Sequence, residues 1–405
     1  MIARATASAV LRRMRAGRLV VVEGERRHAF GPDHAALDAT IHVHSPRFWR
    51  ALLRGSAGLA RSYAAGEWDS PDLVSLVRIG AREMPRLDRL RRPFVPVRNA
   101  LSRVLLNSRS AARRHVAAHY DLGNDLFELF LDETMTYSCA VFDSADADLL
   151  GAQERKLDLV CRKLDLGPDD HVLEIGTGWG SFALHAAGRY GCRVTTTTIS
   201  AEQHARAVER VREAGLSDRV EVLGHDYREL NGRYDKLVSI EMIEAVGWQY
   251  FDEFFSRCSE LLRADGSMLL QAIVVDDAAY EAEKASRSFI RELVFPSGCL
   301  PSHAVIDDSV RRVTDMRPAR LDDITPHYPE TLRRWRERFV AAAADAGRLG
   351  YDRPFRRLWE LYFAYCEGGF RERRIRVVQL ELAKPGRRGG RESGARTLEA
   401  LAARE

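Results

Sequence analysis

The feature that most constrains this chain is a glycine-rich stretch that joins an apolar segment to a helical one. Residues His171–Ile175 have the pattern of a buried strand, and a helix is expected at Ser181–Tyr190. Gly176, Gly178 and Gly180 stand between them. Glycine lets the backbone turn tightly and approach a ligand without a Cβ clash, and a helix N-terminus offers free N–H groups. The stretch therefore predicts a nucleotide-type cofactor site at the carboxyl end of a strand in an open α/β sheet.

Around this stretch, apolar segments and helical patterns alternate along the chain. A helical pattern covers 201–214, between two of the expected strands. Further strands are expected at 193–198, Val220–Leu223, 235–240 and 267–274. This order is typical of a doubly wound sheet, so the expected fold class is α/β with a Rossmann-like sheet.

The first 80 residues have a different pattern, which predicts a smaller α+β module. A short basic amphipathic helix is expected within 1–18, followed by a hairpin over 19–30. A half-buried strand is expected at 39–44, and a helix starts at Pro46 because proline suits the first helical turn.

Composition divides the rest of the chain. Arg and Pro are enriched after residue 80, as in a linker, and polar residues follow the turn at Pro385. The expected order is a module, a linker, a catalytic α/β domain and a polar tail, at 1–80, 81–114, 115–385 and 386–405.

Charge is unevenly distributed, although the 405 residues carry a formal net charge of only +4. Residues 1–120 contain 22 Arg, no Lys and 9 acidic residues, so the remainder of the chain is net acidic. A basic N-terminal third indicates a docking face for a polyanion. An anionic bilayer surface and a nucleic acid both fit that description, and a solvated Arg-rich surface is the third alternative.

Cysteine usage and hydropathy bear on the compartment. The six cysteines form no C-x-x-C pair and have no His nearby at metal spacing, which favours a reducing compartment and no metal site. No apolar run reaches about 18 residues, and the N-terminal arginines precede no secretory apolar region. The expectation is a soluble or peripheral cytoplasmic protein. The cysteines are Cys139, Cys161, Cys192, Cys258, Cys299 and Cys366.

The spacing of the glycines separates two kinds of cofactor. Dinucleotide sites use G-x-G-x-x-G with an acid near the end of the second strand. Here the spacing is G-x-G-x-G, Glu174 lies within the first strand, and the second strand ends at Thr198 without an acid. This pattern resembles motif I of class I methyltransferases with a Rossmann-like sheet, whose donor is S-adenosylmethionine. Asp226, after the third strand, stands where such enzymes often bind the adenine amine, although a solvent-facing Asp is the alternative.

Six motifs occur in an order that resembles the cyclopropane fatty acid synthase and mycolic acid cyclopropane synthase family of lipid methyltransferases. The resemblance covers nearly the whole chain, most strongly 115–385, and residues 1–80 resemble the N-terminal module of the phospholipid-acting members. The motifs are HYDLGNDL at 119–126, MTYSC at 135–139, the glycine stretch at 174–180, EMIEAVG at 241–247, FPSGCLP at 295–301 and YCEGGFR at 365–371.

The resemblance implies an enzyme that adds the methyl carbon of S-adenosylmethionine to the cis double bond of unsaturated phospholipid acyl chains. The product would be a cyclopropane ring, formed at the inner face of the membrane. The residues it assigns to the cofactor belong to four groups: the covering Tyr137 and Ser138; the loop Glu174, Gly176, Gly178 and Gly180; the ribose and methionine contacts Thr198, Ile199 and Gln203; and the adenine contacts Asp226 and Tyr227.

The chemistry sets further requirements. Methylation of an isolated alkene leaves a carbocation, so the site needs a dry apolar tunnel, negative or π-rich walls, and a base. In the resembled family this base is a bound bicarbonate. The resemblance implies that its ligands are Cys139, Glu244, Tyr328 and the main chain of Ile273, while Gln271 replaces the family His. Glutamine donates a hydrogen bond but carries no charge, which weakens the case for bicarbonate.

Several alternatives stay open. Cys139 could act as a nucleophile or as a core residue, and a packing role is favoured because no nearby His would activate its thiol. Glu244 could simply favour the start of a helix. Gln271 and the Glu244–Ala245 pair also resemble a subgroup that makes methylene-branched, tuberculostearic acid-type products.

Two other function classes compete with lipid methylation. The chain could methylate a small soluble molecule and use its N-terminal module for homodimerisation. It could also be an Arg-rich nucleic-acid binder on a degenerate scaffold, but the intact glycines and the lack of interleaved aromatics disfavour that. The expected partners are therefore unsaturated acyl chains and an anionic membrane surface, without nucleic acid.

Overall fold

The computed structural model describes residues 2–91, 123–285, 288–295 and 298–387, and they belong to two compact units. Unit 1 comprises Met1–Val104, Glu281–Pro296 and Tyr328–Ile375. Unit 2 comprises Leu105–Tyr280, Ser297–His327 and Arg376–Glu405. Most of the expected linker and tail lies outside the described residues.

Unit 1 contains a four-stranded sheet with the order β2-β1-β3-β4. β1 pairs antiparallel with β2 and parallel with β3, and β4 pairs antiparallel with β3. The apolar run of β1 supplies buried core residues. The strands are β1 (Arg18–Glu23), β2 (Arg26–Phe30), β3 (Asp38–Val43) and β4 (Trp68–Asp69).

The helices of unit 1 come from distant parts of the sequence. α17 packs on α3, α4 and α15. They are α1 (Ile2–Leu11), α2 (Phe48–Leu53), α3 (Gly55–Ala64), α4 (Leu73–Arg91), the π-helix η4 (Ile290–Val294), α15 (Tyr328–Ala341), α16 (Ala343–Arg348) and α17 (Arg353–Arg371).

The sequence boundary between module and linker, placed at residue 80, falls inside α4, which continues through Pro85 to Arg91. Contacts with α17 explain this. Gly368 lets the helices approach so closely that a Cβ there would lie 2.6 Å from a methyl of Val77. Arg78 and Arg82 both form ion pairs with Glu372. These contacts join segments nearly 300 residues apart, so local composition gives no sign of them.

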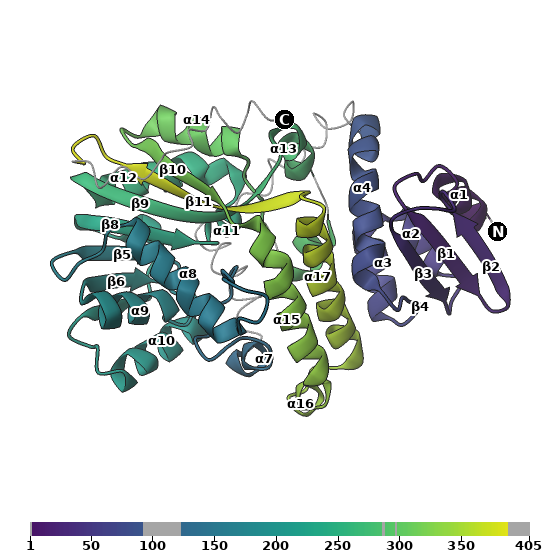
Figure 1. Cartoon of the computed structure of the whole chain (residues 1–405), viewed down its shortest axis with the longest axis horizontal. Helices are drawn as coiled ribbons and strands as arrows, with labels where there is room; N and C mark the ends of the chain where they lie inside the picture. Colours follow the sequence, from purple (N-terminus) through teal and green to yellow (C-terminus); the bar gives the residue numbers. More distant parts are fainter. Residues whose placement is uncertain (1, 92–122, 286–287, 296–297, 388–405) are drawn as a thin grey trace. The chain divides into compact units, whose positions relative to one another are not determined.

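Unit 2 contains a seven-stranded sheet with the order β10-β11-β9-β8-β5-β6-β7 (Figure 1). The five strands from β9 to β7 in that order run parallel, and β10 pairs antiparallel with β11. This confirms the α/β class. The strands are β5 (His171–Ile175), β6 (Arg193–Thr197), β7 (Val220–Leu223), β8 (Tyr234–Ile240), β9 (Leu262–Val275), β10 (Arg317–Asp323) and β11 (Ile375–Ala383).

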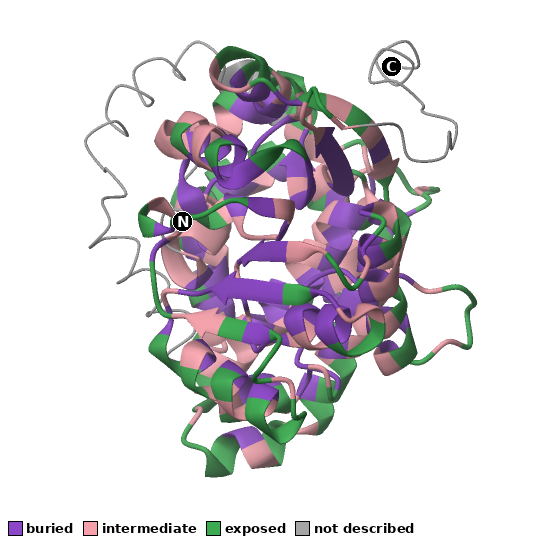
Figure 2. Ribbon diagram, turned by 90° about the vertical axis from the view of Figure 1, so that its left-hand side faces the viewer, coloured by how far each residue is buried: buried purple, intermediate pink, exposed green. Residues whose placement is uncertain are grey.

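Helices of unit 2 pack their apolar faces on this sheet. Residues of α8, α9 and α10 form one buried cluster with β5 and β6, and the strands are largely buried in Figure 2. The helices are α7 (Asn124–Glu128), α8 (Leu149–Lys163), α9 (Ser181–Tyr190), α10 (Ala201–Glu213), η2 (Tyr227–Glu229), α11 (Ile243–Val246), η3 (Trp248–Tyr250), α12 (Phe251–Leu261), α13 (Asp277–Lys284, continuing into unit 1), α14 (His303–Val313) and η5 (Thr325–His327).

The strand order places the functional edge of unit 2. β5 lies between β6 and β8, so the chain runs outward from β5 in one direction and later returns to its other side. Ligands of such sheets bind at this reversal, beyond the carboxyl ends of the strands.

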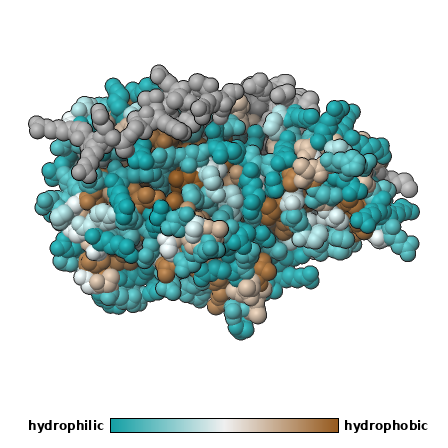
Figure 3. Space-filling model, in the orientation of Figure 1, coloured by the Kyte–Doolittle hydropathy of each residue, from teal (hydrophilic) through white to brown (hydrophobic). Residues whose placement is uncertain are grey.

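Exposed apolar side chains are few on the described surface. Hydrophilic residues dominate the face seen in Figure 3, with small scattered apolar patches. No described helix is both long and apolar enough to cross a bilayer.

Candidate active site

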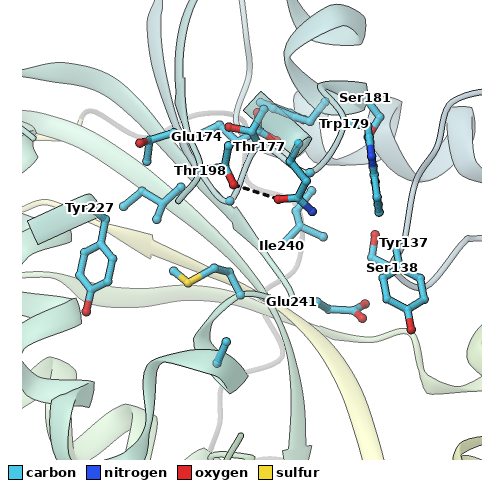
Figure 4. A pocket seen from close by; sticks show the side chains of 18 of the residues that line it. Tyr137, Ser138, Glu174, Thr177, Trp179, Ser181, Thr198, Tyr227, Ile240 and Glu241 are labelled. Carbon is cyan, nitrogen blue, oxygen red and sulfur yellow. Dashed lines mark hydrogen bonds between the residues drawn. The ribbon is translucent and has the colours of Figure 1, made fainter. Parts of the chain in front are cut away.

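A pocket opens beyond the carboxyl ends of β5, β6 and β8, where the strand order predicts a ligand site (Figure 4). Its walls come from the loop 135–138, from α8, from the glycine loop after β5, and from the segments that follow β6, β7 and β8. Every residue assigned to the cofactor by the sequence lines it except Gly180. The structure thus brings these residues together, while their contact with a cofactor stays a prediction.

The glycine loop adopts a backbone that other residues rarely reach. Gly176, Gly178 and Gly180 have φ values of 105°, 53° and 89°. A Cβ on Gly176 would lie 3.2 Å from the side chain of Met242, whereas one on Gly178 would meet no atom of the described residues within 4 Å. Gly180 instead serves as the residue before α9. The loop therefore leaves open space beside its backbone at Gly178 and a close contact at Gly176.

Two buried ionisable groups, one acidic and one basic, face the pocket from β5 and α8. Glu174 accepts a 2.6 Å hydrogen bond from Thr196 Oγ1, and burial raises the pKa of Glu174 to about 8. Lys156 Nζ donates to Ser138 Oγ at 2.9 Å, and burial lowers the pKa of Lys156 to about 8. Both shifts favour the neutral form, because little water reaches either group.

Sequence reasoning missed Lys156. A signal for it was present, because Lys156 lies on the apolar stripe of α8, four residues before Val160 and in line with Gln153. A lysine on the buried face of an amphipathic helix needs a polar environment, and the pocket supplies it.

The segment after β6 carries the polar groups assigned to the ribose and methionine. Thr198 Oγ1 donates to Gln203 Oε1 at 2.9 Å, which leaves the amide nitrogen of Gln203 as the donor end. The side chain of Ser200 caps α10 by accepting from the main-chain N–H of Gln203. Ile199 lines the pocket between them.

Asp226 is not the solvent-facing residue that the alternative proposed, since only 2% of it is exposed. Its two carboxylate oxygens accept from Nε and Nη2 of Arg228 at 2.8 and 2.7 Å. Arg228, which the sequence did not single out, also lines the pocket. Tyr227 packs edge to face on Phe254, with ring centroids 5.5 Å apart. The two hydrogen bonds from Arg228 fix the carboxylate of Asp226 at the end of β7.

Aromatic side chains form another wall. In Figure 4, Trp179 and Tyr137 stand on the same side of the pocket. Trp179 Nε1 donates to Asn124 Oδ1 at 2.7 Å, and the ring centroids of Trp179 and Phe127 are 4.8 Å apart. The ring centroids of Phe127 and Tyr137 are 5.3 Å apart. These contacts fix a π-rich surface, which can stabilise a nearby positive charge.

Cys139 is fully buried, and the pocket lining ends at its neighbour Ser138. Its sulfur lies 3.2 Å from the carbonyl oxygen of Ala140. Its main-chain N–H donates to Glu241 Oε1 at 2.9 Å. The part of Cys139 that reaches the site is therefore its peptide N–H, in keeping with a packing and hydrogen-bonding role.

Glu244 and Ile273 contact each other and are not among the residues that line the pocket. The N–H of Ile273 donates to Glu244 Oε1 at 2.5 Å, while Glu244 Oε2 finds no hydrogen-bond partner among the described residues. Burial raises the pKa of Glu244 to about 8, and the nearby charge of Glu241 adds to the shift. Glu244 is thus largely a neutral acid at pH 7.

Gln271 is held at both ends of its amide. Gln379 Nε2 donates to Gln271 Oε1 at 2.8 Å, and Gln271 Nε2 donates to Glu241 Oε1 at 2.8 Å. Glu241 follows β8, lines the pocket, and was named in the sequence only as the first letter of a motif. No local signal distinguishes it from Glu244, because its direction depends on a left-handed backbone with φ 50°.

Tyr328 is the first residue of α15 in unit 1, where its ring stacks on Phe370 with centroids 4.3 Å apart. Its assignment to the catalytic set stays a prediction. The other four residues of that set, Cys139, Glu244, Gln271 and Ile273, belong to unit 2.

Comparison with known proteins gives consistent matches. A family model described as mycolic acid cyclopropane synthetase matches residues 107–380. The tuberculostearic acid methyltransferase of Mycobacterium tuberculosis is 40% identical over 380 residues, 91% of this chain and 88% of that protein. The cyclopropane-fatty-acyl-phospholipid synthase of Escherichia coli is 35% identical over 353 residues, 85% of this chain and 88% of that protein. A mycolic acid cyclopropane synthase solved with SAH and CTAB has a TM-score of 0.63 and 32% identity, covering 67% of this chain and 98% of that chain.

Proposed function

This chain belongs to the mycolic acid cyclopropane synthetase family, and on that premise we propose that it transfers the methyl carbon of S-adenosylmethionine to the cis double bond of a phospholipid acyl chain. The observation that carries the proposal is the composition of one pocket. A left-handed glycine loop, a wall of aromatic rings and buried carboxyl groups all line it. A cofactor loop, a surface that stabilises cations and a proton acceptor are what alkene methylation requires.

The residues present fit S-adenosylmethionine. Gly178 keeps space open beside the loop, and the amide nitrogen of Gln203 offers a donor near Thr198. Asp226 supplies a buried negative group at the end of β7. When bound, the donor supplies an electrophilic methyl group on a sulfonium. The chain's own residues hold it in place, exclude water and receive the proton that the methylated acyl chain must lose.

Two products remain open, and a specific observation supports each. A cyclopropane ring is the primary proposal, supported by the similarity to the phospholipid synthase over 85% of the chain. A methylene branch is the second candidate, supported by the 40% identity to the tuberculostearic acid methyltransferase and by Gln271 at the family His position. Both begin with the same methyl transfer.

We expect the purified protein to transfer label from methyl-labelled S-adenosylmethionine to vesicles of dioleoyl phosphatidylglycerol. The labelled fatty acids are then treated with ozone, which cleaves the double bond of a methylene branch and leaves a cyclopropane ring intact. Vesicles of dipalmitoyl phosphatidylglycerol are the control, since they lack the alkene. Label that enters only soluble molecules would contradict the proposal and favour the small-substrate alternative.

Docking on an anionic membrane at the inner face is part of the proposal, and α1 with the following turn supports it. Arg12, Arg13 and Arg15 are exposed, and Val10 beside them is 53% exposed. Arg4 is held within unit 1 instead, because it pairs with Glu23 at 2.9 Å. A basic segment with an exposed apolar neighbour suits an anionic lipid surface.

Changing Arg12, Arg13 and Arg15 to Gln should weaken flotation with anionic vesicles on the order of 100-fold at low salt, since each basic residue contributes about 1 kcal/mol near such a surface. Raising the salt concentration should weaken wild-type binding in the same direction. The matched control removes three other exposed arginines, Arg193, Arg212 and Arg338. Equal losses in both triple variants would contradict docking through this segment.

A further inference from the structure

The donors that the family resemblance assigns to a bicarbonate ion are directed at carboxyl groups of this chain. The N–H of Ile273 donates to Glu244, and the amide nitrogen of Gln271 donates to Glu241. The main-chain N–H of Cys139 also donates to Glu241. The residues present therefore do not fit a bicarbonate ion, because the carboxylate of Glu241 takes the donors that such an ion would need.

Glu241 occupies this position through an unusual backbone conformation. Its φ of 50° lies in the left-handed region, which residues other than glycine adopt at a cost and mostly at functional sites. Its own N–H donates to the carbonyl oxygen of Gln271 at 2.8 Å, which anchors the turn at the end of β8. In Figure 4 its carboxylate points towards Ser138 and Tyr137, on the side of the pocket where Trp179 stands.

A chain of side chains fixes which end of Gln271 faces Glu241. Asp322 forms a 2.7 Å ion pair with Lys163, and Lys163 Nζ donates to Gln379 Oε1. Gln379 must then present its NH₂ group to Gln271 Oε1, so Gln271 presents its own NH₂ group to Glu241. Three residues thereby orient one donor towards a carboxylate in the pocket.

Glu241 and Glu244 are suited to different roles. Glu244 lies beside Glu241, is only partly exposed and has a raised pKa, so it is largely protonated at neutral pH. Two N–H groups donate to one oxygen of Glu241, which suits the ionised form. Neighbouring carboxyl groups in contrasting environments are the usual arrangement when one must be the acid and the other the base.

We propose that Glu241 is the internal base of this enzyme and does the work for which the family uses bicarbonate; the inference rests on the proposed function. The alkene electron pair forms the bond to the methyl carbon while the methyl–sulfur bond breaks and its pair stays on sulfur. Glu241 then accepts a proton from the methylated acyl chain. The electron pair of that C–H bond closes the ring directly. For the methylene product, a hydride first shifts from the methyl-bearing carbon to its cationic neighbour, and the pair of a methyl C–H bond then forms the methylene double bond. In both cases Glu241 returns the proton to solvent.

The test compares label transfer to dioleoyl phosphatidylglycerol vesicles in buffer freed of carbon dioxide and in buffer with added bicarbonate. The wild-type rate should be the same in both. The rate of label transfer by Glu241→Gln should be about 100- to 10,000-fold lower than that of wild type, the range expected for a missing base. Its affinity for S-adenosylmethionine, measured by calorimetry, should stay within threefold of wild type. Glu213→Gln, the same change on the exposed side of α10, is the matched control and should keep the wild-type rate.

A second measurement does not depend on activity. Glu241→Ala removes the carboxylate to which the N–H of Cys139 and the amide of Gln271 donate, so a small anion can take its place. NMR with ¹³C-bicarbonate should show binding to Glu241→Ala and none to wild type. Added bicarbonate should also raise the label-transfer rate of Glu241→Ala at least tenfold. It should not raise the rate of Glu241→Gln, because the glutamine amide still fills the position of the Glu241 carboxylate.

Several outcomes would overturn the inference. A wild-type rate that falls tenfold without bicarbonate, wild-type binding of ¹³C-bicarbonate, or a Glu241→Gln variant within threefold of wild type would each do so. Failure of the proposed function looks different, because then wild type labels no unsaturated lipid in either buffer. In that case the NMR comparison still decides whether Glu241 fills the anion site.

Discussion

Replacing Gly176 by alanine should weaken the binding of S-adenosylmethionine by about 10- to 100-fold, which corresponds to about 1.4–2.7 kcal/mol. The φ of 105° at this position disfavours any side chain, and the new Cβ would lie 3.2 Å from Cβ and Cγ of Met242. Met242 itself lines the pocket, so relief of this contact must shift a wall of the cofactor site. Isothermal calorimetry measures the affinity.

The matched control for Gly176→Ala is Gly215→Ala. Gly215, after α10, also has a positive φ, 67°, but a Cβ there would meet no atom of the part of the chain that the structure describes within 4 Å, and it does not line the pocket. Both variants should lose about 1–2 kcal/mol of unfolding free energy from backbone strain. Only Gly176→Ala should lose cofactor affinity. Equal affinities in the two variants would mean that the loop does not hold the cofactor.

The parts of the site that could be predicted from sequence are those with a local cause. Gly176, Gly178 and Gly180 form a recognisable loop because strand, turn and helix follow one another within the 20 residues from His171 to Tyr190. Thr198 and Asp226 line the same pocket for a similar reason, since each follows a parallel strand and parallel strands end at one edge. The order of elements alone carries this information.

The parts that could not be predicted depend on long-range geometry. Glu241 points into the pocket because of one left-handed residue, and its partners Cys139 and Gln271 lie 102 and 30 residues away. The same applies to α4, whose continuation past residue 80 is accompanied by contacts with Gly368 in α17 and with Glu372 at the end of that helix. Composition near Pro85 resembles a linker, yet packing against a distant helix overrides it.

Replacing Glu244 by glutamine should change how stability depends on pH. The pKa of Glu244 in the folded protein is about 8, above its ordinary value of 4.5, because burial penalises the charged form. Between those two pH values the folded protein holds a proton that the unfolded chain has lost. Wild-type unfolding free energy should therefore fall as pH rises through this window, by at most about 1.4 kcal/mol per pH unit for this group.

Glutamine keeps the size of the side chain and cannot ionise. The unfolding free energy of Glu244→Gln should therefore fall less steeply with rising pH than that of wild type, so its stability relative to wild type should increase from pH 5 to pH 8. Urea unfolding curves across that range give the difference. Burial also raises the pKa of Glu174 to about 8, so the unfolding free energy of Glu244→Gln should still fall with pH to some extent. The double variant Glu174→Gln/Glu244→Gln should remove the part of this pH dependence that Glu174 causes. Parallel curves for wild type and Glu244→Gln would show that Glu244 is already ionised when buried. The division of roles with Glu241 would then fail, because two carboxylates side by side would repel each other and neither would serve as the neutral partner.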